Sequence, residues 1–274
     1  MLDKDAKFQP TPPGIESKGS FALSRLRHAL VTCELLPGSF VTEAALDERF
    51  LLGRASVRAA LARLEVEGFV RPAPRAGWQV APITGASIGD VVSAQRMFAC
   101  GLAGLSLPEE TARALARTAT QADALLGRTE AEVVSAARTL RRNFLAGLAA
   151  AQGGLVAAWM AHCLDLEQRM IIWFERTGPR WSPLPLAPVA EALLAGNGAL
   201  ASAALEANVL QFRGWLADCL MRSRDMILAP QQAEPSRPVP ATAEARPVAR
   251  SARKAEERSS AHDRKPGEGN RDHN

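Results

Sequence analysis

Apolar residues between positions 20 and 82 recur at helical spacing in short stretches that turn residues separate. The stripes expected to be buried are Leu23, Leu26 and Leu30 in a first helix, Leu46 and Phe50 in a second, and Val57, Leu61 and Leu64 in a third. The third helix is predicted from Arg54 to about Glu67, and Gly68 is suited to end it. Two short strands, 69–71 and 78–80, follow around a tip at 72–77. This order predicts a winged helix-turn-helix.

The chain from 85 to 228 shows helical spacing throughout and no strand-like alternation. We expect helices at 89–105, 108–126, 130–151, 154–176, 186–195 and 197–224. The predicted fold class is therefore mainly α, with an N-terminal winged helix-turn-helix at 20–82 followed by an all-α helical bundle at 85–228. An aminotransferase-like partner domain would need about twice this length.

The two ends of the chain differ in composition from the rest. Residues 1–19 are polar, and residues 230–274 are rich in Pro, Ala, Arg, Glu and Ser with almost no large apolar side chain. Such sequence cannot bury a core, so both segments are expected to be disordered. For the tail, solvated low-complexity sequence is the main expectation, and a loose functional arm is the alternative.

Composition supports helices and an intracellular protein. Aromatic residues make up 5% of the chain and Tyr is absent, so the core must consist mostly of Leu, Val and Ala. The four cysteines are scattered without a CxxC motif, which indicates small buried thiols in a reducing compartment. We see no signal peptide, and the Ala- and Gly-rich stretch 145–164 favours two buried helices over a membrane span. A cytoplasmic protein without a membrane partner is expected.

The net charge of +4 is mild, so DNA binding has to be argued from a local basic face. Arg54 and Arg58 are four residues apart at the start of the third helix, and in a helix-turn-helix this end enters the major groove, where Arg can bind guanine. Ser56 is small enough to allow close approach. We expect Arg63 either to contact DNA or to pair with Glu67. The alternative for these arginines is an ordinary solvated helix face.

Two glycines and the wing complete the predicted DNA contacts. Arg75 lies at the predicted wing tip beside Gly77, where both are placed for backbone or minor-groove contact. Gly53 can serve as the N-cap of the third helix and leave early backbone N–H groups free for a phosphate.

Three runs carry a resemblance to a known family: ELLPGSFV from Glu34, LDERF from Leu46 and RASVRAALARLEVEG from Arg54. They resemble the DNA-binding domain of the GntR family, whose pattern is GxLxPGxxLxExxLA followed by SRTPVREALxRLExEG. Gly53 stands where the family has Ser, Ala55 and Ser56 replace Thr-Pro, and Ala59 replaces Glu. Both helix arginines match the pattern, and the resemblance therefore implies double-stranded DNA as a partner.

The helical part resembles the FCD-type domain found behind such winged helices. Its anchors are Arg96, the run RRNFLAGL at 141–148, where the family reads DxxFHxxL, and the run EALLAGN at 191–197, where it reads EALxAGD. In that family an Asp and three His commonly hold a metal. The aligned positions here are Arg141, Leu145, Leu186 and Asn208. They form no ligand set, so we predict no metal and no cofactor.

Arg141 places a positive charge where the family has an Asp and a metal. One hypothesis is that Arg141 and Arg96 together bind a carboxylate effector, because guanidinium binds carboxylate bidentately. The alternative is that Arg141 is solvated or paired within the protein and that the pocket is apolar or vestigial.

Together, these expectations describe a DNA-binding regulator that represses or activates transcription. Helical domains would pair two chains into a homodimer on a pseudo-palindromic operator, and a small-molecule effector would shift its DNA affinity. A ligand-independent DNA-binding or protein-interaction module is the alternative. An enzyme is disfavoured, because the sequence shows no His/Cys/Asp set, no Gly-rich phosphate loop and no paired carboxylate motif.

Overall fold

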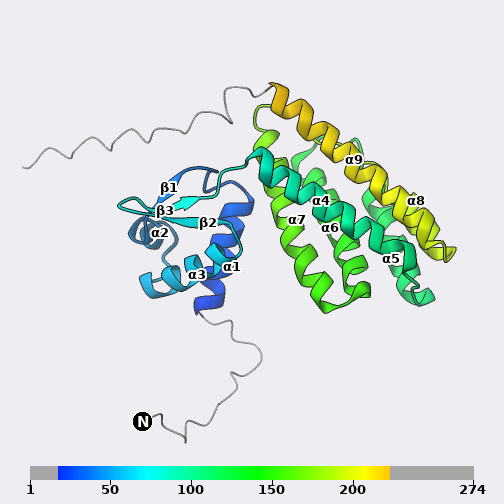
Figure 1. The fold of residues 1–274 in the computed structure, drawn as a ribbon, viewed down its shortest axis with the longest axis horizontal. Coiled ribbons are helices and arrows are strands. Elements are labelled where there is room, and N and C mark those ends of the chain that lie inside the picture. The colour runs from blue at the N-terminus through cyan, green and yellow to red at the C-terminus, as the bar shows by residue number, and fades with distance from the viewer. Residues whose placement is uncertain (1–17, 223–274) are drawn as a thin grey trace, which may run out of the picture. The chain divides into compact units, whose positions relative to one another are not determined.

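A computed structural model describes residues 18–222 of the chain (Figure 1). The predictions of a disordered tail at 230–274 and of most of the lead-in at 1–19 lie outside the described residues. The two described residues of the predicted lead-in, Lys18 and Gly19, already belong to the first helix. All described residues fall within one compact unit.

The first part of the structure is a winged helix-turn-helix with a small sheet. Its elements are α1 (Lys18–Val31), β1 (Phe40–Val41), α2 (Glu43–Phe50), α3 (Arg54–Val66), β2 (Val70–Ala73) and β3 (Gly77–Val80). The antiparallel sheet has the order β1-β3-β2, with Phe40 opposite Gln79 and Val70 opposite Val80. The sequence predicted the β2–β3 hairpin and missed β1, because a strand of two residues is too short to show alternation.

Local hydrogen bonds explain where these helices begin and end. The Thr42 hydroxyl accepts from the Ala45 N–H at 3.1 Å and so caps α2. Gly68, with φ +76°, follows α3 in the left-handed conformation that commonly ends a helix. The largest fully buried side chains of this part are Leu26, Leu30, Leu46, Leu61, Leu64 and Phe69.

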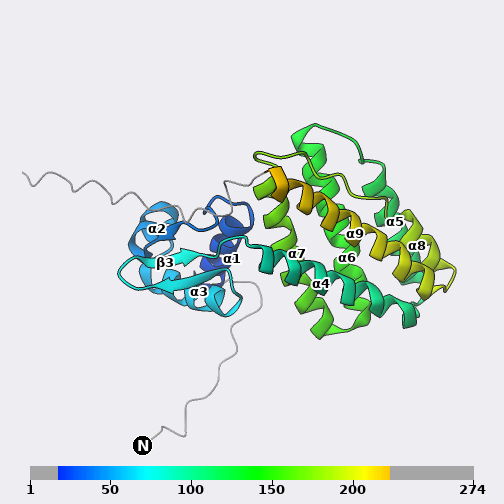
Figure 2. The same ribbon diagram turned by 45° about the horizontal axis from the view of Figure 1, so that its top comes forward.

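The second part is entirely helical, and the predicted fold class is confirmed. Its elements are α4 (Gly85–Gly101), the 3₁₀ turn η1 (Leu102–Gly104), α5 (Glu109–Asp123), α6 (Ala131–Gln152), α7 (Gly154–Phe174), α8 (Ala187–Leu194) and α9 (Gly198–Arg222). Phe144, Phe174 and Phe212 are fully buried in its core. Helices α4 and α9 run side by side, and α6 packs between α5 and α7 (Figure 2).

Helix α7 contacts the winged helix-turn-helix as well as the bundle. Leu166 packs against the buried cores of both parts. The His162 ring meets the Phe69 ring edge-on, with 5.4 Å between ring centroids. Arg169, which is buried, donates from its guanidinium to the carbonyl oxygen of Ala81 in the connection between the two parts.

The cysteines follow the sequence expectation with one correction. Cys33, Cys163 and Cys219 are buried free thiols, whereas Cys100 is exposed on α4. Its neighbour Ala99 takes the buried position on the helix. In the part of the chain that the structure describes, no helix is both long enough and apolar enough to cross a membrane.

Candidate DNA interface and ligand pocket

The N-terminal end of α3 presents its arginines to solvent. Arg54 and Arg58 are both exposed, and Ser56 is partly buried between them. Gly53 is the N-cap with φ +81°, and it supplies no side-chain capping bond to the first turn of α3. Its own N–H donates to the Asp47 carboxylate at 2.7 Å, which fixes the tight connection between α2 and α3. Backbone N–H groups that lack a side-chain cap at a helix N-terminus are typical phosphate ligands, so phosphate contact at this end of α3 stays a prediction.

Arg58 is held by a residue that the sequence analysis did not single out. Its guanidinium donates to the Glu43 carboxylate, with an Nη2–Oε2 distance of 2.8 Å. The hydrogen bonds from Arg58 lower the pKa of the Glu43 carboxyl, so it stays ionised. Arg58 itself remains 73% exposed. Glu43 therefore orients Arg58 without removing it from the surface, and its position next to the Thr42 cap was the available signal.

Arg63 stays largely unpaired at the other end of the exposed α3 face. Its Nε lies 3.8 Å from a Glu67 oxygen, and its side chain is 72% exposed. Glu67 instead accepts a hydrogen bond from Arg27 at 2.8 Å. Pairing with Glu67, which was the alternative to DNA contact for Arg63, is thus weak.

The wing presents Arg75 and shows a steric role for Gly77. Arg75 is exposed in the left-handed conformation, with φ +68°, at the turn between β2 and β3. Gly77 has φ +86°, and a Cβ atom there would lie 2.6 Å from the carbonyl oxygen of Val41. Gly77 is therefore required for the approach of β3 to β1, a reason that the sequence did not show. Arg71, exposed on β2 and bonded to Gln79 at 2.8 Å, is a further basic residue of this surface.

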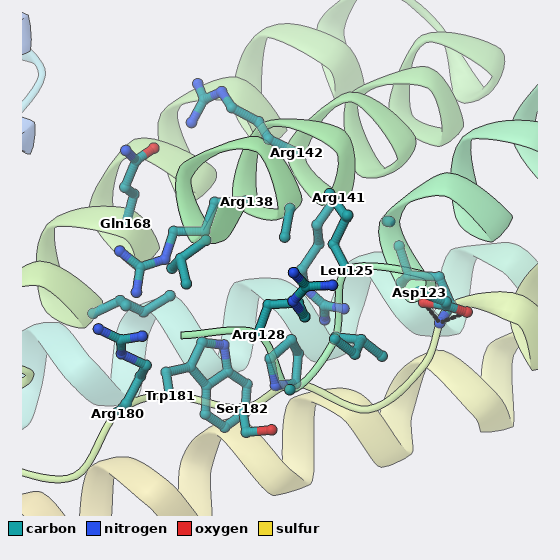
Figure 3. Close-up of a pocket in the computed structure, with 18 of the residues that line it drawn as sticks. Asp123, Leu125, Arg128, Arg138, Arg141, Arg142, Gln168, Arg180, Trp181 and Ser182 are labelled. Atoms are coloured by element: carbon teal, nitrogen blue, oxygen red, sulfur yellow. Dashed lines mark hydrogen bonds between the residues drawn. The ribbon is translucent and has the colours of Figure 1, made fainter. Parts of the chain in front are cut away.

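The helical part encloses a pocket of about 310 Å³ between the end of α5, helices α6 and α7, and the segment 180–186 (Figure 3). Five arginines contribute to its lining: Arg128, Arg138, Arg141, Arg142 and Arg180. Two acidic residues, Asp123 and Glu167, also line it. The lining therefore carries more positive than negative formal charge, which favours an anionic ligand.

Three of the five arginines pair with carboxylates. Ion pairs join Arg138 to Glu175 at 2.6 Å, Arg142 to Asp165 at 2.6 Å and Arg128 to Glu130 at 3.2 Å. Arg180 donates instead to the carbonyl oxygen of Thr129 at 2.8 Å, and Arg141 donates to the amide oxygen of Asn208 at 3.1 Å. These last two contacts are with neutral oxygens, so within the described residues neither Arg141 nor Arg180 forms an ion pair, although the charges of Glu167 and Asp123 act on Arg141.

The acidic residues of the pocket already have partners. The Asp123 carboxylate accepts from the backbone N–H groups of Leu186 and Ala187 at 2.8–2.9 Å, and so caps the start of α8. Glu167 is buried and accepts from the Gln95 amide at 2.9 Å. Burial raises the pKa of Glu167, and the positive charge of Arg141 acts against that rise. Burial also lowers the pKa of the Arg141 guanidinium.

The four positions aligned with the metal ligands of the FCD type come together here. Arg141, Leu145 and Leu186 line the pocket, and Asn208 contacts Arg141. Within residues 18–222, no group of three His, Cys, Asp or Glu side chains could hold a metal ion. The donor chemistry at these positions does not fit a metal.

The structure does not bring Arg96 to this pocket. Arg96 is exposed on α4, where it pairs with Glu206 of α9 at 2.9 Å. Its neighbour Gln95 faces the interior, because successive residues on a helix point about 100° apart. The expectation that Arg96 acts with Arg141 on one ligand is therefore corrected, and Arg141 alone is retained.

Comparison with known proteins places the winged helix-turn-helix in a family. Residues 19–80 match the model of the bacterial regulatory proteins of the gntR family. This part of the chain is therefore similar to the DNA-binding domain of the gntR family. The resemblance seen in the sequence is confirmed, and the helical second part is consistent with the FCD type. The search of curated proteins found no match.

Solved structures share the fold across most of the described chain. Escherichia coli McbR/YncC is 15% identical, with a TM-score of 0.58, and the match covers 74% of this chain and 99% of that protein. A protein described as a GntR transcriptional regulator from Rhodococcus sp. RHA1 is 18% identical, with a TM-score of 0.51 and coverage of 73% and 99%. At these identities the likeness shows a common fold.

Proposed function

We propose that this protein is a GntR-type transcriptional regulator that binds double-stranded DNA as a homodimer, and that a carboxylate ligand in the Arg141 pocket changes its DNA affinity. The DNA-binding surface would consist of the N-terminal end of α3 and the wing. Two copies would place two such surfaces on a pseudo-palindromic operator. The unpartnered, buried Nε of Arg141 is the observation that carries the ligand half of the proposal.

Exposure and orientation support DNA contact by α3. Arg54 and Arg58 are free of the core, and Glu43 holds Arg58 in one direction. An arginine that is already oriented loses less conformational freedom when it meets a guanine edge. Arg75 at the wing tip and Arg63 on the exposed helix face would add backbone contacts, which raise affinity without reading sequence. Ser56 would allow close approach of the helix.

The state of Arg141 supports a bound anion. A buried guanidinium N–H without an acceptor is costly, and within the described residues the Nε of Arg141 has none. A carboxylate in the pocket would accept from it and compensate the buried charge. The volume of about 310 Å³ suits a compact organic acid. An open pocket of this kind argues against the alternative of a filled, ligand-independent bundle.

Selection from random duplex DNA tests the DNA-binding proposal. The purified protein is compared with an Arg54→Ala/Arg58→Ala double variant, and bound DNA is sequenced. We expect a two-fold symmetric site that the double variant fails to enrich. Arg113→Ala/Arg117→Ala is a matched control, because these two exposed arginines are also four apart on a helix, in α5. Equal, salt-sensitive binding by all three proteins would overturn the proposal.

Calorimetry with organic acids tests the ligand. Mono-, di- and tricarboxylates, with citrate among them, are titrated into the wild type, Arg141→Gln and Arg96→Gln. We expect at least one acid to bind the wild type and Arg96→Gln alike, and to bind Arg141→Gln about 10-fold or more weakly, since a charge-assisted hydrogen bond contributes roughly 1.5–3 kcal/mol. Equal affinity of an acid for the wild type and for Arg141→Gln would contradict the assignment of this pocket. Sedimentation at equilibrium tests the dimer.

A further inference from the structure

Charged side chains form a continuous path from the pocket to the C-terminal end of α3. Arg142 of α6 pairs with Asp165 of α7 at 2.6 Å. The second oxygen of Asp165 lies 3.7 Å from Arg27 of α1. Arg27 in turn pairs with Glu67 at 2.5 Å, and Glu67 is the C-cap residue of α3. The path therefore joins a pocket-lining residue to the helix that carries Arg54 and Arg58.

The members of this path are shielded from water more than ordinary surface pairs. Asp165 is 14% exposed and Glu67 is 23% exposed, whereas the isolated pair Arg113–Glu109 on α5 is 63% and 74% exposed. The hydrogen bond to Glu67 raises the pKa of Arg27. The edge-on contact between Phe69 and His162 lies beside the path, and the Arg27 guanidinium is 5.9 Å from the centroid of the same Phe69 ring. Partly desolvated charges such as these interact more strongly than exposed ones.

Arg142 differs from the other paired arginines of the pocket. Arg138 pairs with Glu175, whose carboxylate also accepts from the backbone N–H of Trp181, and Arg128 pairs with Glu130. Both of these pairs stay within the helical part. The stem of Arg142 lines the pocket, while Figure 3 shows its guanidinium turned away from Arg128 and Arg141. Of these three pairs, that of Arg142 is the one that leads to the winged helix.

We propose that Arg142 and Asp165 transmit ligand binding to the DNA-binding domain. An anion in the pocket attracts the Arg142 guanidinium and competes with Asp165 for it. Asp165 then interacts with Arg27 alone. Because Arg27 also pairs with Glu67 at the end of α3, the strength of that second pair changes. The ionic interaction between α7 and the C-terminal end of α3 changes as a result. This inference rests on the proposed effector function, and it adds a route by which a ligand in the pocket affects the proposed DNA-binding surface.

The variant Asp165→Asn tests this route, because it removes the charge at nearly constant volume and Asp165 does not line the pocket. The probes are citrate and the operator duplex obtained by selection, used with the full-length protein. Two quantities are measured: the Kd for citrate, and the ratio of operator Kd values with and without citrate. Glu206→Gln is the matched control, since it breaks a cross-helix pair with Arg96 that lies off the path.

If the route operates, Asp165→Asn binds citrate about fivefold more tightly, because Arg142 no longer has to leave a carboxylate. The effect of citrate on operator affinity, expected to be about fivefold or more in the wild type, falls to near unity in Asp165→Asn and persists in Glu206→Gln. Unchanged citrate affinity with an unchanged operator ratio in Asp165→Asn would overturn the route.

A different result separates this inference from the proposed function. If citrate and the other acids do not bind the wild type, the carboxylate proposal fails. The route is then judged without ligand, from operator Kd values alone. It requires Asp165→Asn to change operator affinity about threefold or more relative to Glu206→Gln, a shift within the range of mutations that modulate coupling. Equal operator affinities in these two variants would overturn it.

Discussion

Replacing Gly77 by alanine tests the steric account of the wing. The residue has φ +86°, and a left-handed conformation costs a non-glycine residue roughly 1–2 kcal/mol. The added Cβ would also lie 2.6 Å from the carbonyl oxygen of Val41, so β1 or β3 has to move. Overpacking against a fixed neighbour typically costs about 1–3 kcal/mol more. Together these effects predict a loss of about 2–5 kcal/mol of unfolding free energy.

Gly68→Ala provides the matched control. Gly68 has φ +76°, and a Cβ atom there would meet nothing within 4 Å. It should therefore lose only the conformational part, roughly 1–2 kcal/mol. Urea unfolding of both variants and the wild type, followed by circular dichroism, gives the two differences. Equal losses for Gly77→Ala and Gly68→Ala would refute the close approach of β3 to β1 as the reason for glycine at position 77.

Three further predictions concern charge and reactivity. Glu43→Gln should free Arg58 and tighten binding to random duplex DNA while lowering the preference for the selected operator, as measured by competition binding; an unchanged preference would show that Glu43 does not orient Arg58. Burial raises the pKa of Glu167 from its ordinary 4.5, so this group contributes stability at low pH that is lost as pH rises through its folded pKa. The Glu167→Gln variant should therefore become more stable relative to the wild type as the pH rises from about 4, measured as the difference between their unfolding free energies. A difference that does not change with pH would contradict this prediction. A thiol reagent at about pH 8 should label Cys100 well before Cys163, whose pKa burial raises to about 12, as read by mass spectrometry of peptides; equal rates would refute the burial difference.

The sequence predicted most elements because their signals are local. The helices of both parts begin and end within a few residues of the predicted positions, since apolar spacing, caps and turn residues all lie within each segment. Strand β1 was missed because its two residues gain their strand character from pairing with β3, which is distant in the chain. Tertiary pairing of this kind leaves no local pattern.

The candidate site was predictable only in part. Arg141 could be placed in the pocket through its alignment with a family motif, whereas Arg96 was misplaced because one residue of helical phase separates it from the buried Gln95. The partners that organise both sites could not be found from sequence. Glu43 meets Arg58 across 15 residues, and Asp165 meets Arg27 from another part of the chain. Ion pairs between distant segments depend on packing that no single stretch of sequence specifies.

Leu166 has a consequence for how the two parts of this fold can be recombined with those of other proteins. Because the Leu166 side chain packs against both buried cores, helix α7 belongs to both parts of the structure. The boundary between the two parts therefore does not fall only in the connection near Ala81. A chimera joined at that connection would give the winged helix a foreign surface in place of Leu166 and His162. The exchangeable unit therefore consists of the winged helix-turn-helix together with the face of α7 that matches it, and a chimera built on this fold has to keep both.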